Sequence, residues 1–387
     1  MDPDRVASVT IPDFPTSVMI TPTSPQPMEA DTSELIADSD GGATSGRNES
    51  LAKIEITVLS VILVIAIVGN SLMLIALRRQ LNFRPMSRMY FFMLNLSIAD
   101  LFVAFGNILP QLAWDITFRF QGNDLLCRIV KFLQVFVLYV STYILTSMAI
   151  DRYLVVCHHT FSRNYYSGLK GPRILVAASY IFSFLLATPQ VFIFSYMDVP
   201  NNPGIRDCWV TFIEPWGQKA YVTFFVVCAF IFPLMVIGVS YGAICCKVIR
   251  FRLPKEARVQ KPQNKRRKTK YSFSSSSAGT RDEQETESVD EAPLRKASEE
   301  RGALRRQISQ AKMKTLKLTL TVVICFFVCW APFSITQLVI AYNPAKNAGP
   351  LQVIFLLLAS LNSCTNPWIY LAFSESLCNQ LRVRFSV

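Results

Sequence analysis

The residue types that usually do chemistry are few in this 387-residue chain, and their spacing fits no catalytic pattern. Its two histidines, His158 and His159, are adjacent, and no glycine-rich phosphate loop or Cys-x-x-Cys pair follows a strand-like segment. The charges that stand out are Asp100 and the pair Asp151 and Arg152, because each interrupts or ends a long apolar run. A charge at membrane depth costs about 2.5–3.5 kcal/mol, so it normally faces the interior of a helix bundle and serves a function. We therefore expect a membrane protein that is not an enzyme.

Long uncharged segments must position these residues. The chain is 51% apolar and 17% charged, and soluble domains are about 25% charged. Five stretches of 22 to 28 residues contain no Asp, Glu, Lys or Arg, and each is long enough to cross a bilayer as a helix. These stretches are Ile56–Leu77, Ile174–Met197, Ala220–Cys246, Leu318–Ala345 and Asn347–Ser374.

Two further apolar runs, Met89–Trp114 and Phe132–Ile150, bring the number of predicted spans to seven. The fold class is therefore an all-α membrane protein, a seven-helix transmembrane bundle over residues 53–373. Orientation follows from the positive-inside rule. The segment 250–311 holds 16 Lys and Arg against 9 Asp and Glu, whereas residues 1–50 hold 9 acids and two arginines. We expect the N-terminus outside the cell and the C-terminus inside.

The segments outside the bundle carry weaker signals. Residues 1–52 are expected to be a disordered external tail with a glycosylation sequon at Asn48. Residues 250–311 are expected to be a flexible cytoplasmic loop whose basic cluster is attracted to anionic lipid rather than to nucleic acid. Residues 374–387 suggest a short amphipathic helix on the membrane, with Cys378 as a candidate for palmitoylation.

The cysteines indicate one disulfide. Six of the ten fall in or at the ends of apolar runs, where a free cysteine behaves as a small hydrophobic residue. Cys127 and Cys208 are the pair that the predicted topology places together in an oxidising compartment. We expect them to form a bridge that tethers the loop between spans four and five.

Three classes of protein fit seven spans with an external N-terminus: a signalling receptor, a retinal protein, and a transporter or channel. A retinal protein needs a Schiff-base lysine, and the last span, Asn347–Ser374, contains none. Transporters often show repeated halves, and no such self-similarity is evident.

Five motifs on five spans favour the receptor. Over residues 53–385 the chain resembles the rhodopsin-like family of G-protein-coupled receptors. The motifs are Gly69–Asn70, Leu96–Asp100, Asp151–Tyr153, Cys329–Pro332 and Asn366–Tyr370.

The resemblance implies an ion site inside the bundle. A buried carboxylate has to be paired or bind a cation. By resemblance, Asp100 would hold a sodium ion together with Ser141, Asn362, Ser363 and Asn366; the alternative is a polar network without a resident cation. No other cofactor is expected.

The resemblance also implies an activation switch. Asp151 would hold Arg152 at rest, and activation would free that arginine. Pro332 and Pro367 remove helix hydrogen bonds and should kink spans six and seven. The switch residues are Asp151, Arg152, Tyr153, Tyr241, Trp330, Pro332, Asn366, Pro367 and Tyr370.

More closely, the chain is similar to the vasopressin/oxytocin receptor family, through stretches such as Trp114–Phe120, Thr188–Gln190 and Asp207–Trp209. Ligands of that family are amidated nonapeptides with a disulfide-closed ring. Amide side chains donate and accept at once, which suits a ligand dense in peptide groups. Asp115 and Glu55 are candidates for a cationic tail residue. The resemblance implies a site formed by Arg47, Glu55, Asn107, Gln111, Asp115, Lys131, Gln134, Gln190, Trp330, Phe333 and Gln337.

The chain departs from the family pattern at Asn107, where a glutamine is usual, and at Ser334, where a phenylalanine is usual. Both positions touch the pocket, so receptors for cardioactive peptide and neuropeptide S remain alternatives. The resemblance further implies coupling to a heterotrimeric G protein of the Gq or Gs type, with arrestin as a second partner, in the plasma membrane.

Overall fold

The computed structural model describes residues 49–83, 85–199, 202–212, 216–252, 317, 320–343 and 350–373. Arg47, Asn48 and Cys378 lie outside the described residues, as do the tail through residue 48, most of the loop 250–311 and the segment 374–387. The chain divides into two units, Met1–Ile244 with Leu318–Val387, and Cys245–Lys317. Every contact discussed below belongs to the first unit.

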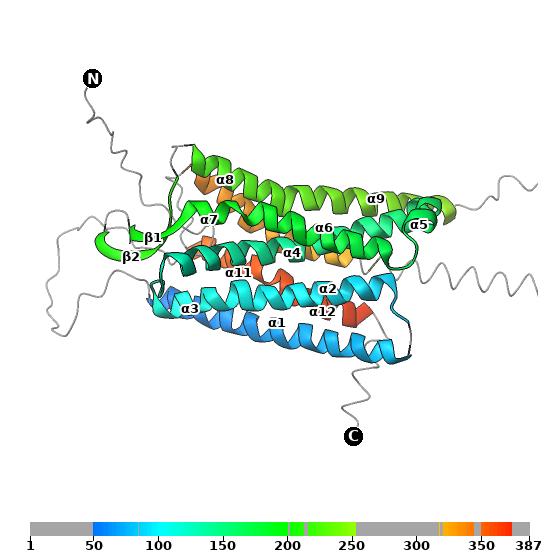
Figure 1. The fold of residues 1–387 in the computed structure, drawn as a ribbon, viewed down its shortest axis with the longest axis horizontal. Coiled ribbons are helices and arrows are strands. Elements are labelled where there is room, and N and C mark those ends of the chain that lie inside the picture. Colours follow the sequence, from blue (N-terminus) through cyan, green and yellow to red (C-terminus); the bar gives the residue numbers. More distant parts are fainter. Residues whose placement is uncertain are drawn as a thin grey trace, which may run out of the picture. The chain divides into compact units, whose positions relative to one another are not determined.

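Long helices make up the first unit and run side by side (Figure 1). Among the described residues, six helices are long and apolar enough to cross a membrane, and a bent pair, Ile354–Ser360 and Asn362–Ala372, provides a seventh span. The seven-helix bundle expected from the sequence is thereby confirmed. The helices are α1 (Glu49–Phe83), α2 (Arg88–Val103), α3 (Leu109–Thr117), α4 (Asp124–Cys157), α5 (His159–Tyr165), α6 (Lys170–Ala187), α7 (Pro189–Ile193), α8 (Gly217–Val226), α9 (Phe232–Arg252), the helix Leu320–Tyr342, α11 (Pro350–Ser360) and α12 (Asn362–Phe373). Helix α1 begins inside the segment expected to be a disordered tail.

A β-hairpin, which the apolar pattern did not predict, lies at the end of the unit opposite α5 (Figure 1). Strands β1 (Phe194–Val199) and β2 (Asn202–Val210) are antiparallel, with Tyr196 opposite Cys208. The run Ile174–Met197, predicted to be one span, therefore ends as helix at Ile193, and its last residues form β1. Hydropathy cannot separate the two because an apolar segment scores alike as helix or strand, and β1 obtains its hydrogen bonds from the polar segment β2 that follows it. We call this the hairpin end and the opposite one the α5 end.

Two π-helical turns, η2 (Ala104–Ile108) and η3 (Val227–Ile231), precede Pro110 and Pro233. Proline lacks an N–H and clashes with the carbonyl four residues earlier, and a widened turn relieves both problems. In η3 the Cys228 carbonyl accepts a hydrogen bond from the Tyr143 hydroxyl at 2.8 Å. The η3 bulge thus bonds to α4 as well as accommodating Pro233.

The last span bends by 44° at Leu361, so the kink expected at Pro367 lies six residues earlier along the chain. Pro367 itself lies inside helix α12. The Ser363 carbonyl, which the missing N–H of Pro367 leaves without its helical partner, accepts a hydrogen bond from Asn70 Nδ2 at 3.2 Å. An α1 side chain therefore replaces the lost bond. The helix Leu320–Tyr342 is continuous through Pro332.

Candidate functional site

A partly open cavity lies between the spans. Its walls are mostly apolar, with two buried amide side chains, Asn107 from the η2 turn and Gln134 from α4. The lining residues are Asn107, Gln134, Val135, Leu138, Phe225, Trp330, Phe333, Leu356, Ala359 and Ser360. The structure thus brings together four residues predicted from the sequence and adds six, including Ser360.

Polar atoms around the cavity have unused hydrogen-bonding capacity. Both amide atoms of Gln134, Asn107 Oδ1 and Trp330 Nε1 are buried and have no hydrogen-bond partner among the described residues. Leaving a buried donor or acceptor unpaired costs about 1–3 kcal/mol. A ligand that presents both donors and acceptors in this cavity would recover that free energy.

Aromatic rings form one side of the cavity and continue beyond it as a row from Phe333 through Trp330 and Phe326 to Phe230. Phe333 lies edge-on to both Trp330 and Phe225, with ring centroids 6.3 and 6.5 Å apart. Trp330 in turn contacts Phe326 at 6.2 Å, and Phe326 contacts Phe230 at the same spacing. Because interiors are close-packed, a ligand that displaces Phe333 or Trp330 would shift this whole row of rings.

Lys131 is fully buried on the hairpin side of Gln134. Its Nζ lies 4.1 Å from the centre of the Trp114 ring and 5.2 Å from that of Phe194, which are favourable cation–π distances. Asp115 and Asp207 are the carboxylates whose charges act on it. The cation is therefore held by two aromatic faces and neighbouring negative charge.

Asp115, expected to pair with a cationic tail residue of the ligand, is buried. It is only 3% exposed, and its Oδ1 accepts a hydrogen bond from Gln111 Nε2 at 2.7 Å. Glu55, the other expected partner of a cationic tail, is half-buried on α1 and does not line the cavity. Gln337 is buried and likewise lies outside the cavity lining.

Gln190 is fully buried, and its amide nitrogen donates to the Tyr221 hydroxyl of α8. Tyr221 was not predicted from the sequence. It fixes the orientation of Gln190, whose Oε1 has no hydrogen-bond partner among the described residues.

The predicted bridge between Cys127 and Cys208 is confirmed, with the two Cα atoms 5.5 Å apart. Beside it, Asp207 is 2% exposed and joins the hairpin to the end of α3. Its Oδ1 accepts from the backbone N–H of Phe120 at 3.0 Å and of Cys208 at 2.8 Å, and its Oδ2 pairs with Arg119 at 3.3 Å. The bridge and this carboxylate together fix the hairpin over the bundle.

Asp100 is fully buried in the middle of the unit. Its Oδ1 accepts from Ser141 Oγ at 2.6 Å and its Oδ2 from Asn366 Nδ2 at 3.0 Å. Ser363 and Asn362, also predicted for this site, are buried on α12. The hydrogen bonds to Asp100 come from neutral groups, so the set of hydroxyl, amide and carboxylate oxygens fits a monovalent cation, which would balance the buried charge.

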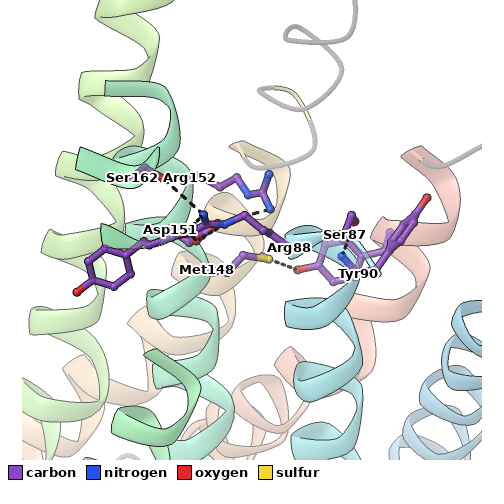
Figure 2. Close-up of polar contacts among 9 residues, drawn as sticks. Ser87, Arg88, Tyr90, Met148, Asp151, Arg152 and Ser162 are labelled. Atoms are coloured by element: carbon purple, nitrogen blue, oxygen red, sulfur yellow. Dashed lines mark hydrogen bonds and ion pairs between the residues drawn. The ribbon is translucent and has the colours of Figure 1, made fainter. Parts of the chain in front are cut away.

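At the α5 end, Asp151 is fully buried and accepts two hydrogen bonds at Oδ1 from Arg88 of α2. Arg152 lies further away, with its terminal nitrogen 3.7 Å from Asp151 Oδ2 (Figure 2). The Tyr153 hydroxyl is 3.0 Å from His158 Nε2, and the Tyr370 hydroxyl points at the Met148 sulfur at 3.8 Å. Four predicted switch residues, Asp151, Arg152, Tyr153 and Tyr370, therefore lie at this end, where two arginines share the Asp151 carboxylate. Trp330 instead lines the cavity, and Asn366 bonds to Asp100.

Comparison with known proteins supports this arrangement. Residues 69–370 match the model of the 7 transmembrane receptor (rhodopsin family). The chain belongs to the rhodopsin family of seven-transmembrane receptors. The receptor is 41% identical over 350 residues to the oxytocin receptor of Ovis aries, which covers 89% of this chain and 83% of that protein. It is also 41% identical over 346 residues to the mesotocin receptor of Rhinella marina, covering 88% and 78% of the two chains.

The predicted similarity to vasopressin and oxytocin receptors is thereby confirmed, and the receptor is a multi-pass protein of the plasma membrane. Sequence reasoning gave no role to two residues that organise its ends, Asp207 and Arg88. A signal existed for Arg88: it opens helix α2 directly after its N-cap Ser87. A cation is unfavourable at that end of the helix dipole, so its presence there indicates another partner.

Proposed function

We propose that the receptor binds an oxytocin-type cyclic nonapeptide at the hairpin end and transmits that binding to a heterotrimeric G protein at the α5 end. In this scheme the hairpin end faces the outside of the cell, as the charge distribution of the sequence predicts. The receptor itself performs no chemical step; the G protein exchanges nucleotide.

The observation that carries the proposal is the set of unpaired polar atoms on Gln134, Asn107 and Trp330 around a largely apolar cavity. A peptide ring offers carbonyl acceptors, N–H donors and apolar side chains in one compact ligand, so it matches both features. The names of the two relatives, oxytocin receptor and mesotocin receptor, favour the same ligand class.

The signal would pass along the row of rings below the cavity. A ligand shifts a conformational equilibrium only through its different affinity for the two states. Contact with Phe333 and Trp330 would favour a state in which the α5 end opens and Arg152 is released from Asp151. We propose a Gq or Gs protein as the partner there, with arrestin as a second partner.

The Asp100 cluster is proposed to hold a sodium ion in the resting state. The ion would supply the positive charge that the buried carboxylate lacks, with oxygen atoms of Ser141 and Ser363 and the Asn366 side chain beside it. The alternative, a polar network without a cation, predicts no effect of sodium on the resting receptor.

The test measures intracellular calcium and cAMP in cells that express the receptor, challenged with oxytocin- and vasopressin-type nonapeptides. Gln134→Ala should lower peptide potency about 10- to 100-fold, because it removes one or two hydrogen bonds of about 1.4 kcal/mol each. Gln80→Ala is the matched control, since Gln80 is also a buried glutamine but lies near the C-terminal end of α1 and does not line the cavity. It should leave potency unchanged.

Cardioactive-type and neuropeptide S-type peptides belong in the same panel. A response to one of these, with no response to nonapeptides from well-expressed receptor, would keep the receptor class and overturn the ligand. The calcium or cAMP signal identifies the coupled G protein.

A further inference from the structure

The Arg88 side chain joins three elements at the α5 end. Its Nε donates to Asp151 Oδ1 of α4 at 3.0 Å, and a terminal nitrogen contacts the same oxygen. The other terminal nitrogen donates to the Tyr166 carbonyl at 2.8 Å and to the Ser162 hydroxyl at 3.4 Å. Figure 2 shows Arg88, Asp151, Arg152 and Ser162 gathered at this point.

Two guanidinium groups thus share one buried carboxylate, and Arg88 has the closer contact. Arg152 lies 3.7 Å from Asp151 Oδ2, which is beyond hydrogen-bond distance, and that oxygen has no hydrogen-bond partner among the described residues. If Arg88 were removed, the buried Asp151 would have to find another cation. The cation already beside it is Arg152.

Helix α5 depends on the same arginine. It has seven residues, and its N-cap, His158, provides no side-chain hydrogen bond. A helix this short is unstable without outside contacts. Arg88 bonds to the Ser162 hydroxyl within α5 and to the carbonyl of its C-cap, Tyr166, where a positive charge is favourable.

We propose that Arg88 is a positioning residue for G-protein coupling: it keeps Asp151 from closing onto Arg152 and holds α5 in place for the partner. The inference rests on the proposed coupling at this end of the receptor. Loss of Arg88 therefore strengthens the resting contact between Asp151 and Arg152 and loosens α5. Both changes lower signalling, and neither acts through the peptide site.

The first experiment measures agonist-free second-messenger production per receptor at the cell surface. Arg88→Ala should lower it about fivefold, the lower end of typical allosteric coupling. Arg88→Lys should give an intermediate value, because an ammonium pairs with Asp151 but lacks the fork that also reaches Tyr166. Arg173→Ala removes an exposed arginine at the start of α6 and should change nothing.

A double-mutant cycle tests whether Arg88 acts through the carboxylate. Asp151→Asn should raise agonist-free signalling, because it removes the group that holds Arg152. Adding Arg88→Ala to this variant should then lower signalling by less than fivefold, because only the loss of the contacts with Ser162 and Tyr166 remains. A full fivefold loss in that background, or no loss in the wild-type background, overturns the proposal.

Hydrogen exchange supplies a readout that needs neither peptide nor G protein. In purified receptor, amides of α5 should exchange faster in Arg88→Ala than in wild type, and unchanged exchange overturns the proposal. Failure of the nonapeptides alone refutes the ligand assignment and leaves these tests intact. Signalling at the level of mock-transfected cells from both wild type and Asp151→Asn would contradict the coupling, and the inference with it.

Discussion

Replacing Asp207 with alanine should destabilise the hairpin end more than any exposed substitution in the hairpin. The carboxylate is 2% exposed and accepts two backbone N–H bonds, from Phe120 and Cys208, as well as the ion pair from Arg119. Alanine would leave the two N–H groups without their acceptor and the Arg119 guanidinium without its counter-charge. Such a change leaves buried groups uncompensated rather than merely removing a contact.

The expected loss of stability follows from these two lost hydrogen bonds and the lost ion pair. Breaking a buried pair by removing one partner typically costs about 3–5 kcal/mol. At about 2 °C per kcal/mol for a large domain, Asp207→Ala should lower the Tm by roughly 6–10 °C. Asp207→Asn keeps an oxygen for the two backbone donors and loses only the charge, so we expect a fall of roughly 2–4 °C.

The assay is thermal unfolding of purified receptor in nanodiscs at one heating rate, since membrane-protein unfolding is often irreversible. Asp198→Ala is the matched control, because its ion pair with Arg206 lies in the same hairpin at 3.7 Å with both side chains about 60% exposed. It should leave the Tm unchanged within about 1 °C. An Asp207→Ala receptor that melts with the wild type would refute this account of how the hairpin is held.

Two further predictions concern the interior. Asn70→Ala should lower the Tm by roughly 2–6 °C in the same assay, because it leaves the Ser363 carbonyl unpaired. The control is Asn95→Ala, which should lower the Tm less, because the Asn95 amide bonds the Phe91 carbonyl of its own helix. Equal losses of Tm in the two variants would contradict the role given to Asn70. Sodium chloride should raise the Tm of the wild type above that in choline chloride of equal ionic strength, and Asp100→Asn should abolish the difference. A sodium effect that persists in Asp100→Asn would place the ion elsewhere.

The sequence by itself determined the parts of the fold that depend on composition and local pattern. Uncharged runs of sufficient length predict membrane spans because no other structure satisfies the backbone in lipid. The same reasoning singled out Asp100 and Asp151, since a charge in such a run needs a purpose. The Cys127–Cys208 bridge followed from topology, and the family followed from motifs at fixed places on the spans.

Tertiary structure decided which side chains meet. The last residues of the Ile174–Met197 run form a strand because β2 pairs with them. Helix α12 accommodates Pro367 because Asn70 of α1 bonds the carbonyl that the proline leaves unpaired. The partners of Asp207 and Asp151 lie 88 and 63 residues away along the chain. Hydrophobic periodicity records which face of a helix is buried, but it does not record which distant side chain that face will contact. That choice is made by packing, which brings Arg88, and not Arg152, to hydrogen-bond distance of Asp151.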